Sequence, residues 1–272
     1  MKRLPLVLLA MVIIAPVGAQ LVPPNELGLA MGHVHLNVSD VELHRQIWIN
    51  HFDAVPLEHE GLTGVKIPGM ILLFRQQEPT GPSQETVLDH FGLKVRSRAE
   101  IVDRWRAAGM EVPFEFTGAA GFPNAYLQAP DGLRIELQQD IEQPELAIAH
   151  HLHYMKPDHL TVRQWYIDTF SAVASTRGRI QTADIPGMNL SFNPPRQRGP
   201  DPVPTRVGTR GRTIDHIGFE VSNLEAFCKQ LEAKGIVFDR PYRENPDIGV
   251  ATAFFTDPFG VYVELTEGLR QY

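Results

Sequence analysis

Histidines that recur at fixed strand positions are the residues of this chain with the clearest potential for chemistry. In the segment GHVHLNV, His33 and His35 stand two residues apart, and alternate residues of a β-strand point to the same face. The same pair returns in HHLHYM, where His151 and His153 follow at a spacing of 118 residues. Two imidazoles on one strand face could hold a metal ion or lie on a solvated surface, and the rest of the chain must decide between these possibilities.

Two further histidines and two glutamates favour the metal. His90 and His216 open the segments LDHFGLKV and IDHIGFEV, and Glu136 and Glu264 occupy matching positions in APDGLRIEL and DPFGVYVEL. Two histidines and one carboxylate on one side of a sheet form a three-ligand set that leaves coordination positions open. We therefore expect a divalent metal cofactor, Fe²⁺, Mn²⁺ or Zn²⁺.

The elements that must position these residues come from a duplication. The first and third segments keep one register as far as IPGMILLF (67–74) and IPGMNLSF (185–192), and the second and fourth segments match at a spacing of 126 residues. Each segment begins with a strand that carries His, continues with an amphipathic helix, and ends in short β-rich stretches broken by Gly and Pro. Ser-x-x-Glu capping boxes predict helix starts at Ser39, Ser97 and Ser222. The sequence thus predicts four βαβββ modules.

Period-two alternation assigns the two faces of the predicted sheets. In the first strand Val34, Leu36 and Val38 form an apolar face, and the histidines lie on the other face. The strands that contain Glu136 and Glu264 alternate in the same way. The apolar faces should pack under the helices, which leaves His and Glu together on the concave face.

At this point the chain resembles the vicinal oxygen chelate superfamily, which includes glyoxalase I, bleomycin resistance proteins and type I extradiol dioxygenases. The resemblance covers residues 31–268 and depends on the DHxG openings at Asp89 and Asp215 and the PxGxxxE closings at Pro130 and Pro258. It implies an α+β fold with four βαβββ modules in two tandem glyoxalase-like domains, residues 31–140 and 148–268, each an open cup of mixed β-sheet with helices outside. It further implies two metal sites, listed here by half: His33, His90 and Glu136; His151, His216 and Glu264.

The resemblance leaves three kinds of function open. Extradiol dioxygenases carry a catalytic His before a Tyr, whereas here Phe254 holds the Tyr position and no His lies between Ile217 and Glu264. Glyoxalase I and the epimerases add an acidic group that MILLF and MNLSF lack, so a non-catalytic sequestering protein is the third possibility. We expect a glyoxalase-like lyase or isomerase acting on a small ligand with vicinal oxygens. The candidate catalytic residues on the concave face are Glu220, Tyr126, Tyr262, His35 and His153.

Composition narrows the partners and the location. A formal net charge of −7 disfavours nucleic-acid binding, and the single cysteine, Cys228, excludes an intrachain disulfide. The N-terminus has the layout of a secretory signal, with Lys2 and Arg3, an apolar run and small residues before a cleavage point after Ala19. We expect residues 1–19 to be removed and the mature protein to be periplasmic or secreted, without stable membrane insertion.

Overall fold

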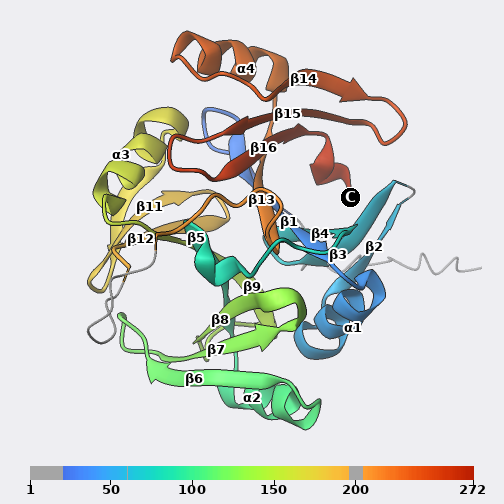
Figure 1. Cartoon of the computed structure of the whole chain (residues 1–272), viewed down its shortest axis with the longest axis vertical. Helices are drawn as coiled ribbons and strands as arrows, with labels where there is room; N and C mark the ends of the chain where they lie inside the picture. Colours follow the sequence, from blue (N-terminus) through green and yellow to red (C-terminus); the bar gives the residue numbers. More distant parts are fainter. Residues whose placement is uncertain (1–20, 60, 196–204) are drawn as a thin grey trace, which may run out of the picture.

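The computed structural model describes residues 21–59, 61–195 and 205–272, and it contains four βαβββ modules in chain order (Figure 1). The predicted signal segment lies outside the described residues. The first module comprises β1 (Leu29–Val38), α1 (Val41–Phe52), β2 (Val55–His59), β3 (Leu62–Ile67) and β4 (Met70–Gln76). The second comprises β5 (Leu88–Val95), α2 (Arg98–Ala107), β6 (Glu111–Thr117), β7 (Pro123–Ala129) and β8 (Leu133–Gln139).

The second half repeats this order. The third module comprises β9 (Ala147–Met155), α3 (His159–Phe170), β10 (Val173–Arg177), β11 (Ile180–Ile185) and β12 (Met188–Asn193). The fourth comprises β13 (Ile214–Val221), α4 (Leu224–Ala233), β14 (Arg240–Asn245), β15 (Val250–Thr256) and β16 (Tyr262–Glu267). The predicted α+β fold class and the four modules are therefore confirmed.

Side-chain caps fix where three of the helices begin. Ser97 caps α2 as predicted and accepts a hydrogen bond from the backbone N–H of Glu100 at 3.2 Å. The predictions at Ser39 and Ser222 were one residue early, because Asp40 and Asn223 supply the capping oxygens of α1 and α4. Asp and Asn cap helices as well as Ser does, so adjacent polar residues leave the exact start undetermined in the sequence.

The modules combine into two eight-stranded sheets in a nested order. One sheet has the strand order β14-β15-β16-β13-β1-β4-β3-β2, and the other has β10-β11-β12-β9-β5-β8-β7-β6. The first module thus joins the fourth through antiparallel pairing of β1 with β13, and the second joins the third through β5 and β9. Each sheet therefore combines modules from both halves of the chain, whereas the bounds 31–140 and 148–268 divide the chain by sequence.

The connector lengths are compatible with the nested order. Residues 140–146 join β8 to β9, two strands of one sheet that are separated only by β5, and seven residues suffice for this path. The longer connectors, 77–87 and 194–213, each pass from one sheet to the other. Their described parts run side by side, with hydrogen bonds from Thr80 N to Gly211 O (2.8 Å) and from Val87 N to Val207 O (2.9 Å).

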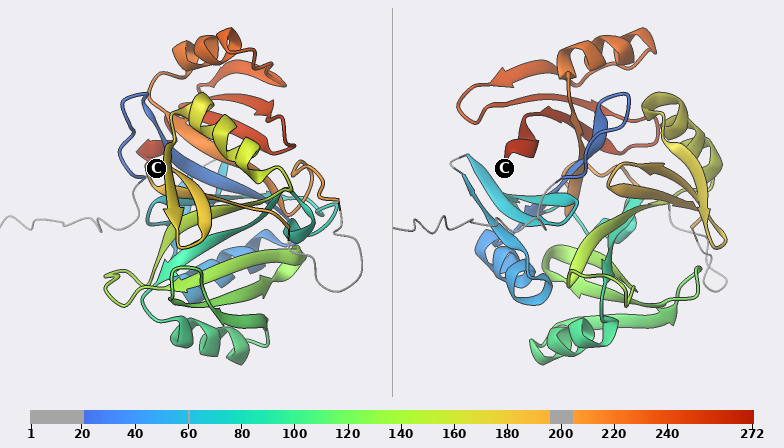
Figure 2. Two further views of the ribbon diagram at one scale, coloured as in Figure 1. Left: turned by 90° about the vertical axis from the view of Figure 1, so that its left-hand side faces the viewer. Right: turned by 180° about the vertical axis from the view of Figure 1, so that it is seen from behind.

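The apolar faces of both sheets form the core. Val34, Leu36 and Val38 are fully buried, as are the helix residues Trp48 and Trp105. The four helices lie on the outside of the molecule, and the concave faces of the sheets are left for the polar residues (Figure 2). Cys228 is buried and unpaired in this core. Among the described residues, no helix combines the length and the apolar character needed to cross a membrane.

Candidate metal sites

The second and third modules bring together three histidines and one glutamate, which we call the inner site: His90, Glu136, His151 and His153. One nitrogen or oxygen of each side chain lies within 4.8 Å of those of the others. His90 Nε2 is 2.9 Å from Glu136 Oε2, and His151 Nε2 is 3.4 Å from the same oxygen. All four residues are buried. The arrangement directs imidazole nitrogens and a carboxylate oxygen to one point.

The first and fourth modules build an equivalent set, the outer site: His33, His35, His216 and Glu264. His33 Nε2 and His216 Nε2 each lie 2.9 Å from Glu264 Oε2, and His35 lies within the same 4.8 Å group. Three of the residues are buried and His35 is partly exposed. The two sites therefore have the same donor types in the same strand positions.

The structure brings all six sequence-predicted ligands into these sites but divides them differently. His33 lies with His216 and Glu264 rather than with His90 and Glu136, because β1 pairs with β13. His35 and His153, expected only as catalytic or ligand-facing groups, stand where each could be a fourth ligand. The ligand sets predicted from the two halves of the sequence are therefore corrected. Each site combines ligands from both halves, because the modules pair across the halves.

Buried nitrogen atoms without hydrogen-bond partners test whether a metal fits. Within the described part of the chain, His153 Nδ1 and His35 Nε2 are buried and have no such partner. Buried polar atoms are normally hydrogen-bonded, so these nitrogens point to a missing ligand. Three imidazoles and one carboxylate are donors that suit Fe²⁺, Mn²⁺ and Zn²⁺. The residues present therefore fit a divalent transition metal.

Protonation states at the inner site agree with this fit. Burial lowers the pKa of His153 to about 4 and, together with the charge of Arg177, lowers the pKa of His151 well below its ordinary value. Burial also disfavours a charged His90, but hydrogen bonds to Asp89 and Glu136 outweigh burial and raise its pKa. Burial would raise the pKa of Glu136, but its contacts with His151 and His90 outweigh burial and keep that pKa well below its usual range. A metal needs neutral imidazoles and an ionised carboxylate. These pKa shifts favour the neutral forms of His151 and His153 and the ionised form of Glu136.

The glycine of each DHxG segment makes room for the partner module. A Cβ atom added at Gly92 would lie 2.0 Å from His151 Cε1, and one added at Gly218 would lie 1.9 Å from His33 Cε1. Carbon atoms cannot approach so closely, so any side chain there would displace the opposing imidazole. The glycine is thus a requirement of the metal site rather than of a turn.

The aspartate of the same segment orients its neighbouring histidine, a role that the sequence analysis missed. His90 Nδ1 donates to Asp89 Oδ1 at 2.7 Å, and His216 Nδ1 donates to Asp215 Oδ1 at 2.6 Å. A carboxylate on the far ring nitrogen fixes the tautomer that leaves Nε2 available for a metal. The signal was present, since Asp precedes His in both DHxG segments.

The residue that occupies a shared β-bulge distinguishes the inner site from the outer one. Gly92 pairs with His151 and Leu93 with Ala149, which leaves His150 unpaired in the ladder. The Nδ1 atoms of His150 and His151 lie 3.0 Å apart, within hydrogen-bonding distance. In the outer site the corresponding bulge residue is Gly32, and His33 Nδ1 is buried with no hydrogen-bond partner among the described residues. Of the two sites, only the inner one therefore has an additional histidine, His150, within hydrogen-bonding distance of a candidate metal ligand.

The remaining candidate catalytic residues have separate roles. Glu220 accepts hydrogen bonds from Thr266 Oγ1 (2.6 Å), Gly268 N (3.0 Å) and Arg270 N (3.1 Å), so its carboxylate fixes the last turn and is poorly placed as a base. The ring of Tyr126 lies 5.2 Å from that of His90, and the ring of Tyr262 lies 5.6 Å from that of His216. Each tyrosine therefore borders its metal site without being among the four possible ligands.

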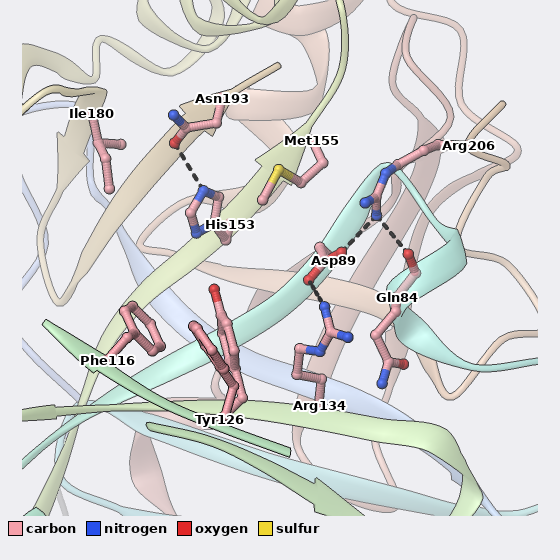
Figure 3. Close-up of a pocket in the computed structure, with 11 residues that line it drawn as sticks. Gln84, Asp89, Phe116, Tyr126, Arg134, His153, Met155, Ile180, Asn193 and Arg206 are labelled. Carbon is pink, nitrogen blue, oxygen red and sulfur yellow. Dashed lines mark hydrogen bonds and ion pairs between the residues drawn. The ribbon is translucent and has the colours of Figure 1, made fainter. Parts of the chain in front are cut away.

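A cavity of about 290 Å³ opens beside the inner site (Figure 3). Its walls combine aromatic, charged and amide side chains, and His153 connects it to the metal ligands. Figure 3 shows Phe116 and Tyr126 on one side and Arg134 and Arg206 on the other, with Asn193 hydrogen-bonded to His153. The lining residues are Gln84, Asp89, Phe114, Phe116, Tyr126, Arg134, His153, Met155, Ile180, Asn193 and Arg206.

Comparisons with known proteins agree with this architecture. Residues 149–265 match the model of the Glyoxalase/Bleomycin resistance protein/Dioxygenase superfamily. A comparison with curated proteins found no match. Glyoxalase I from Zea mays is 16% identical, with a TM-score of 0.65 over 89% of this chain and 94% of that chain. A candidate dioxygenase from Bacillus subtilis subsp. subtilis str. 168 is 13% identical, with a TM-score of 0.59 over 92% and 86%.

Identities this low show a shared fold and nothing finer. The match to the superfamily model concerns residues 149–265. For that segment it confirms the resemblance to the vicinal oxygen chelate superfamily that the DHxG and PxGxxxE segments first indicated.

Proposed function

We propose that this protein is a divalent-metal-dependent enzyme that binds a small ligand through two neighbouring oxygens and acts on it at the inner site, as a glyoxalase-like lyase or isomerase. The observation that carries the proposal is the convergence of three imidazoles and one carboxylate beside a cavity that one of them, His153, lines. The buried Nδ1 atom of His153, which has no hydrogen-bond partner among the described residues, supports it. A divalent transition metal held by these side chains could in addition bind both neighbouring oxygens of a small ligand.

The chain's own residues prepare this site. A divalent metal held there would supply a Lewis acid that stabilises negative charge on a ligand's vicinal oxygens. Asp89 orients His90, and Asn124 Nδ2 donates to Glu136 Oε1 at 2.5 Å, which fixes the carboxylate. Asn193 Oδ1 lies 2.9 Å from His153 Nε2, and a proton on Nε2 would leave the Nδ1 lone pair free. His153 can then complete the ligand set or accept a proton from the ligand.

A ring-cleaving dioxygenase is the second candidate. The aromatic wall formed by Phe114, Phe116 and Tyr126 favours it, because such a wall suits an aromatic ring beside the metal. The candidate dioxygenase from Bacillus subtilis shares the fold over most of both chains. Metal-dependent oxygen consumption distinguishes this reaction from proton transfer.

Metal analysis tests the metal sites. We expect residues 20–272, purified without chelator and loaded with Mn²⁺, to hold about two equivalents, one for each four-residue site. Glu136→Ala and Glu264→Ala should each lose about one equivalent, since each removes the oxygen on which two imidazoles converge. Unchanged metal content in both variants would rule out the assignment.

Two assays on the loaded protein test the chemistry. Hydroxyacetone carries vicinal oxygens and an acidic C–H bond, so we expect metal-dependent exchange of its protons in D₂O, measured by NMR. Glu136→Ala should abolish the exchange, and Glu264→Ala should retain it. Oxygen consumption by the Fe²⁺-loaded protein with catechol would instead support the dioxygenase. Bound metal with neither activity would leave a sequestering protein.

We also propose that the protein is exported, on the basis of Lys2, Arg3 and the apolar run that follows. Expression of the full chain should yield a periplasmic or secreted product whose N-terminal residue is Gln20, identified by mass spectrometry. Retention in the cytosol with an intact N-terminus would contradict the proposal.

A further inference from the structure

Two arginines on one wall of the inner cavity share a single carboxylate. Arg134 Nη1 donates to Asp89 Oδ1 at 3.1 Å, and Arg206 Nη1 donates to Asp89 Oδ2 at 2.6 Å. Arg206 Nη1 also donates to the carbonyl oxygens of Gln84 and Thr86, which fixes its guanidinium on the 77–87 connector. Both arginines are therefore held at the cavity by contacts outside their own strand or segment.

The charges at this wall do not balance. Asp89 is the one acidic residue among the eleven that line the cavity, and it also accepts a hydrogen bond from His90 Nδ1. Two guanidinium groups thus face one carboxylate that is already hydrogen-bonded on both oxygens, in a protein whose net charge is −7. Arg134 Nε is buried and has no hydrogen-bond partner within the described residues. A buried donor without an acceptor is costly, so a bound anion would satisfy it.

The opposite wall is aromatic. The rings of Phe114 and Phe116 stack with centroids 5.5 Å apart, and Phe116 lies 5.0 Å from Tyr126. Phe114 is 54% exposed and offers apolar surface that a ligand could cover. The guanidinium of Arg134 lies 5.2 Å from the ring centroid of Tyr126, so the cationic and aromatic walls meet at this residue.

The cavity's dimensions limit the occupant. About 290 Å³ is at the small end of the range for ligand pockets, enough for one ring with short substituents. His153 and Asn193 form a third side (Figure 3), and His153 is itself a member of the inner site. A ligand in this space can contact the arginines, the aromatic rings and the inner site together.

We propose that the inner cavity selects a small organic anion, with a carboxylate against Arg134 and Arg206, a flat apolar body against Phe116 and Tyr126, and its neighbouring oxygens toward the inner site. This inference deepens the proposed function and rests on it for the metal-facing end of the ligand. The arginine pair would recognise the ligand's negative charge, whereas the inner site would recognise its neighbouring oxygens. The two ends of the ligand can therefore be tested separately.

A matched pair of probes tests the anionic end. 3,4-Dihydroxybenzoate and catechol have the same vicinal oxygens and differ by one carboxylate. With the Mn²⁺-loaded protein, calorimetry should show 3,4-dihydroxybenzoate binding at least about tenfold more tightly, the gain expected of a charge-assisted contact. In Arg206→Gln this preference should fall to about twofold, while the affinity for catechol and the metal content stay unchanged. Equal binding of the two probes to the unmodified protein would overturn the inference.

Further variants separate a specific site from a general charge effect. Arg104→Gln removes the same charge from the exposed surface of α2 and should leave the preference intact. Arg134→Lys keeps the charge but loses the guanidinium fork, and it should reduce the preference by less than Arg206→Gln. A loss of preference in Arg104→Gln equal to that in Arg206→Gln would contradict a site at the inner cavity.

Benzoate and the metal-free protein distinguish this inference from the proposed function. Benzoate has no vicinal hydroxyl groups, so it reports the arginine and aromatic walls alone. Binding of benzoate to the metal-free protein, lost in Arg206→Gln, would support the anion site even if no metal were bound. Metal binding without any preference for 3,4-dihydroxybenzoate would leave the proposed function standing and overturn the anion site.

Discussion

The inner and outer sites carry the same donor types on equivalent strands of the two sheets, yet their surroundings differ. The inner site has His150 behind His151, an open cavity, and polar neighbours such as Ser191, whose Oγ accepts from Arg177 at 2.8 Å. In the outer cup, Leu73 stands at the position equivalent to Ser191 and packs in a small apolar cluster. That cluster consists of Leu21, Leu57, Ile71, Leu73 and Leu269.

This comparison separates two requirements of a duplicated fold. Both sites have the same ligand types, because the first strand of every module carries His and the last strand of the second and fourth modules carries Glu. The residues around them are free to change, because they do not determine how the strands pair. The following predictions test the difference between the sites, from the largest expected effect to the smallest.

The largest effect should come from removing two ligands of different sites. His33→Ala together with His216→Ala should lose no more than the one metal equivalent that either change removes alone, because both belong to the outer site. His33→Ala together with His90→Ala should lose both equivalents. Metal analysis after dialysis measures each case. Loss of only one equivalent in the His33 and His90 double variant would show that these histidines share a site.

Next in size are the glycines on which the opposing imidazoles pack. Gly92→Ala should destabilise the metal-free protein by roughly 1–3 kcal/mol, as expected for overpacking, and should disrupt the inner site. Gly218→Ala should do the same at the outer site. Urea unfolding and metal analysis measure both, and each variant is the other's control. A variant that affected both sites equally would mean that the two cups are not independent.

The aspartates next to His90 and His216 should have an intermediate effect. Asp89→Asn and Asp215→Asn each remove the carboxylate on Nδ1 and should weaken metal binding at their own site by about 10- to 100-fold. Asp89→Asn also releases Arg134 and Arg206, so it alone should change the affinity for 3,4-dihydroxybenzoate. Competition with a fluorescent chelator gives the metal affinities. Equal effects of both variants on the anion would contradict a role confined to the inner cavity.

The smallest effect should come from His150. His150→Ala removes one hydrogen bond to His151 and should weaken metal binding at the inner site by about three- to tenfold, the value of a typical net hydrogen bond. The outer site has Gly32 at this position and should not respond. His150→Asn keeps a polar side chain and should lose less. The same chelator competition applies, and a change at the outer site would argue against a local effect.

The modules and their faces could be predicted because both follow from short-range patterns. Strict alternation placed Val34 and Leu36 in the core and His33 and His35 on the concave side, and the repeat supplied the other positions. The sequence also identified every residue of the two four-residue groups, since each lies at a repeated strand position.

The division of those residues between the sites could not be predicted. It depends on whether β5 pairs with β9 or with a strand of the first module, and both connections are possible for connectors of 7 and 11 residues. The bulge at His150 was also invisible, because the register of one strand is set by its partner. Asp89 could be located in the sequence, but its role could be recognised only from the position of the His90 ring in the structure.

The nested pairing has a consequence for how the chain can fold. The edge of β1 that pairs with β13 has no partner until β13 is synthesised, which happens only after the second and third modules. This edge therefore stays unpaired through most of chain synthesis. Residues 21 and 270 are neighbours in the folded protein, since Arg270 Nη1 donates to the carbonyl oxygens of Leu21 and Val22. A circular permutant that begins in the 77–87 connector and joins these ends would place partner modules next to each other in sequence. Such a chain would have a lower contact order and should fold faster, while keeping both metal sites.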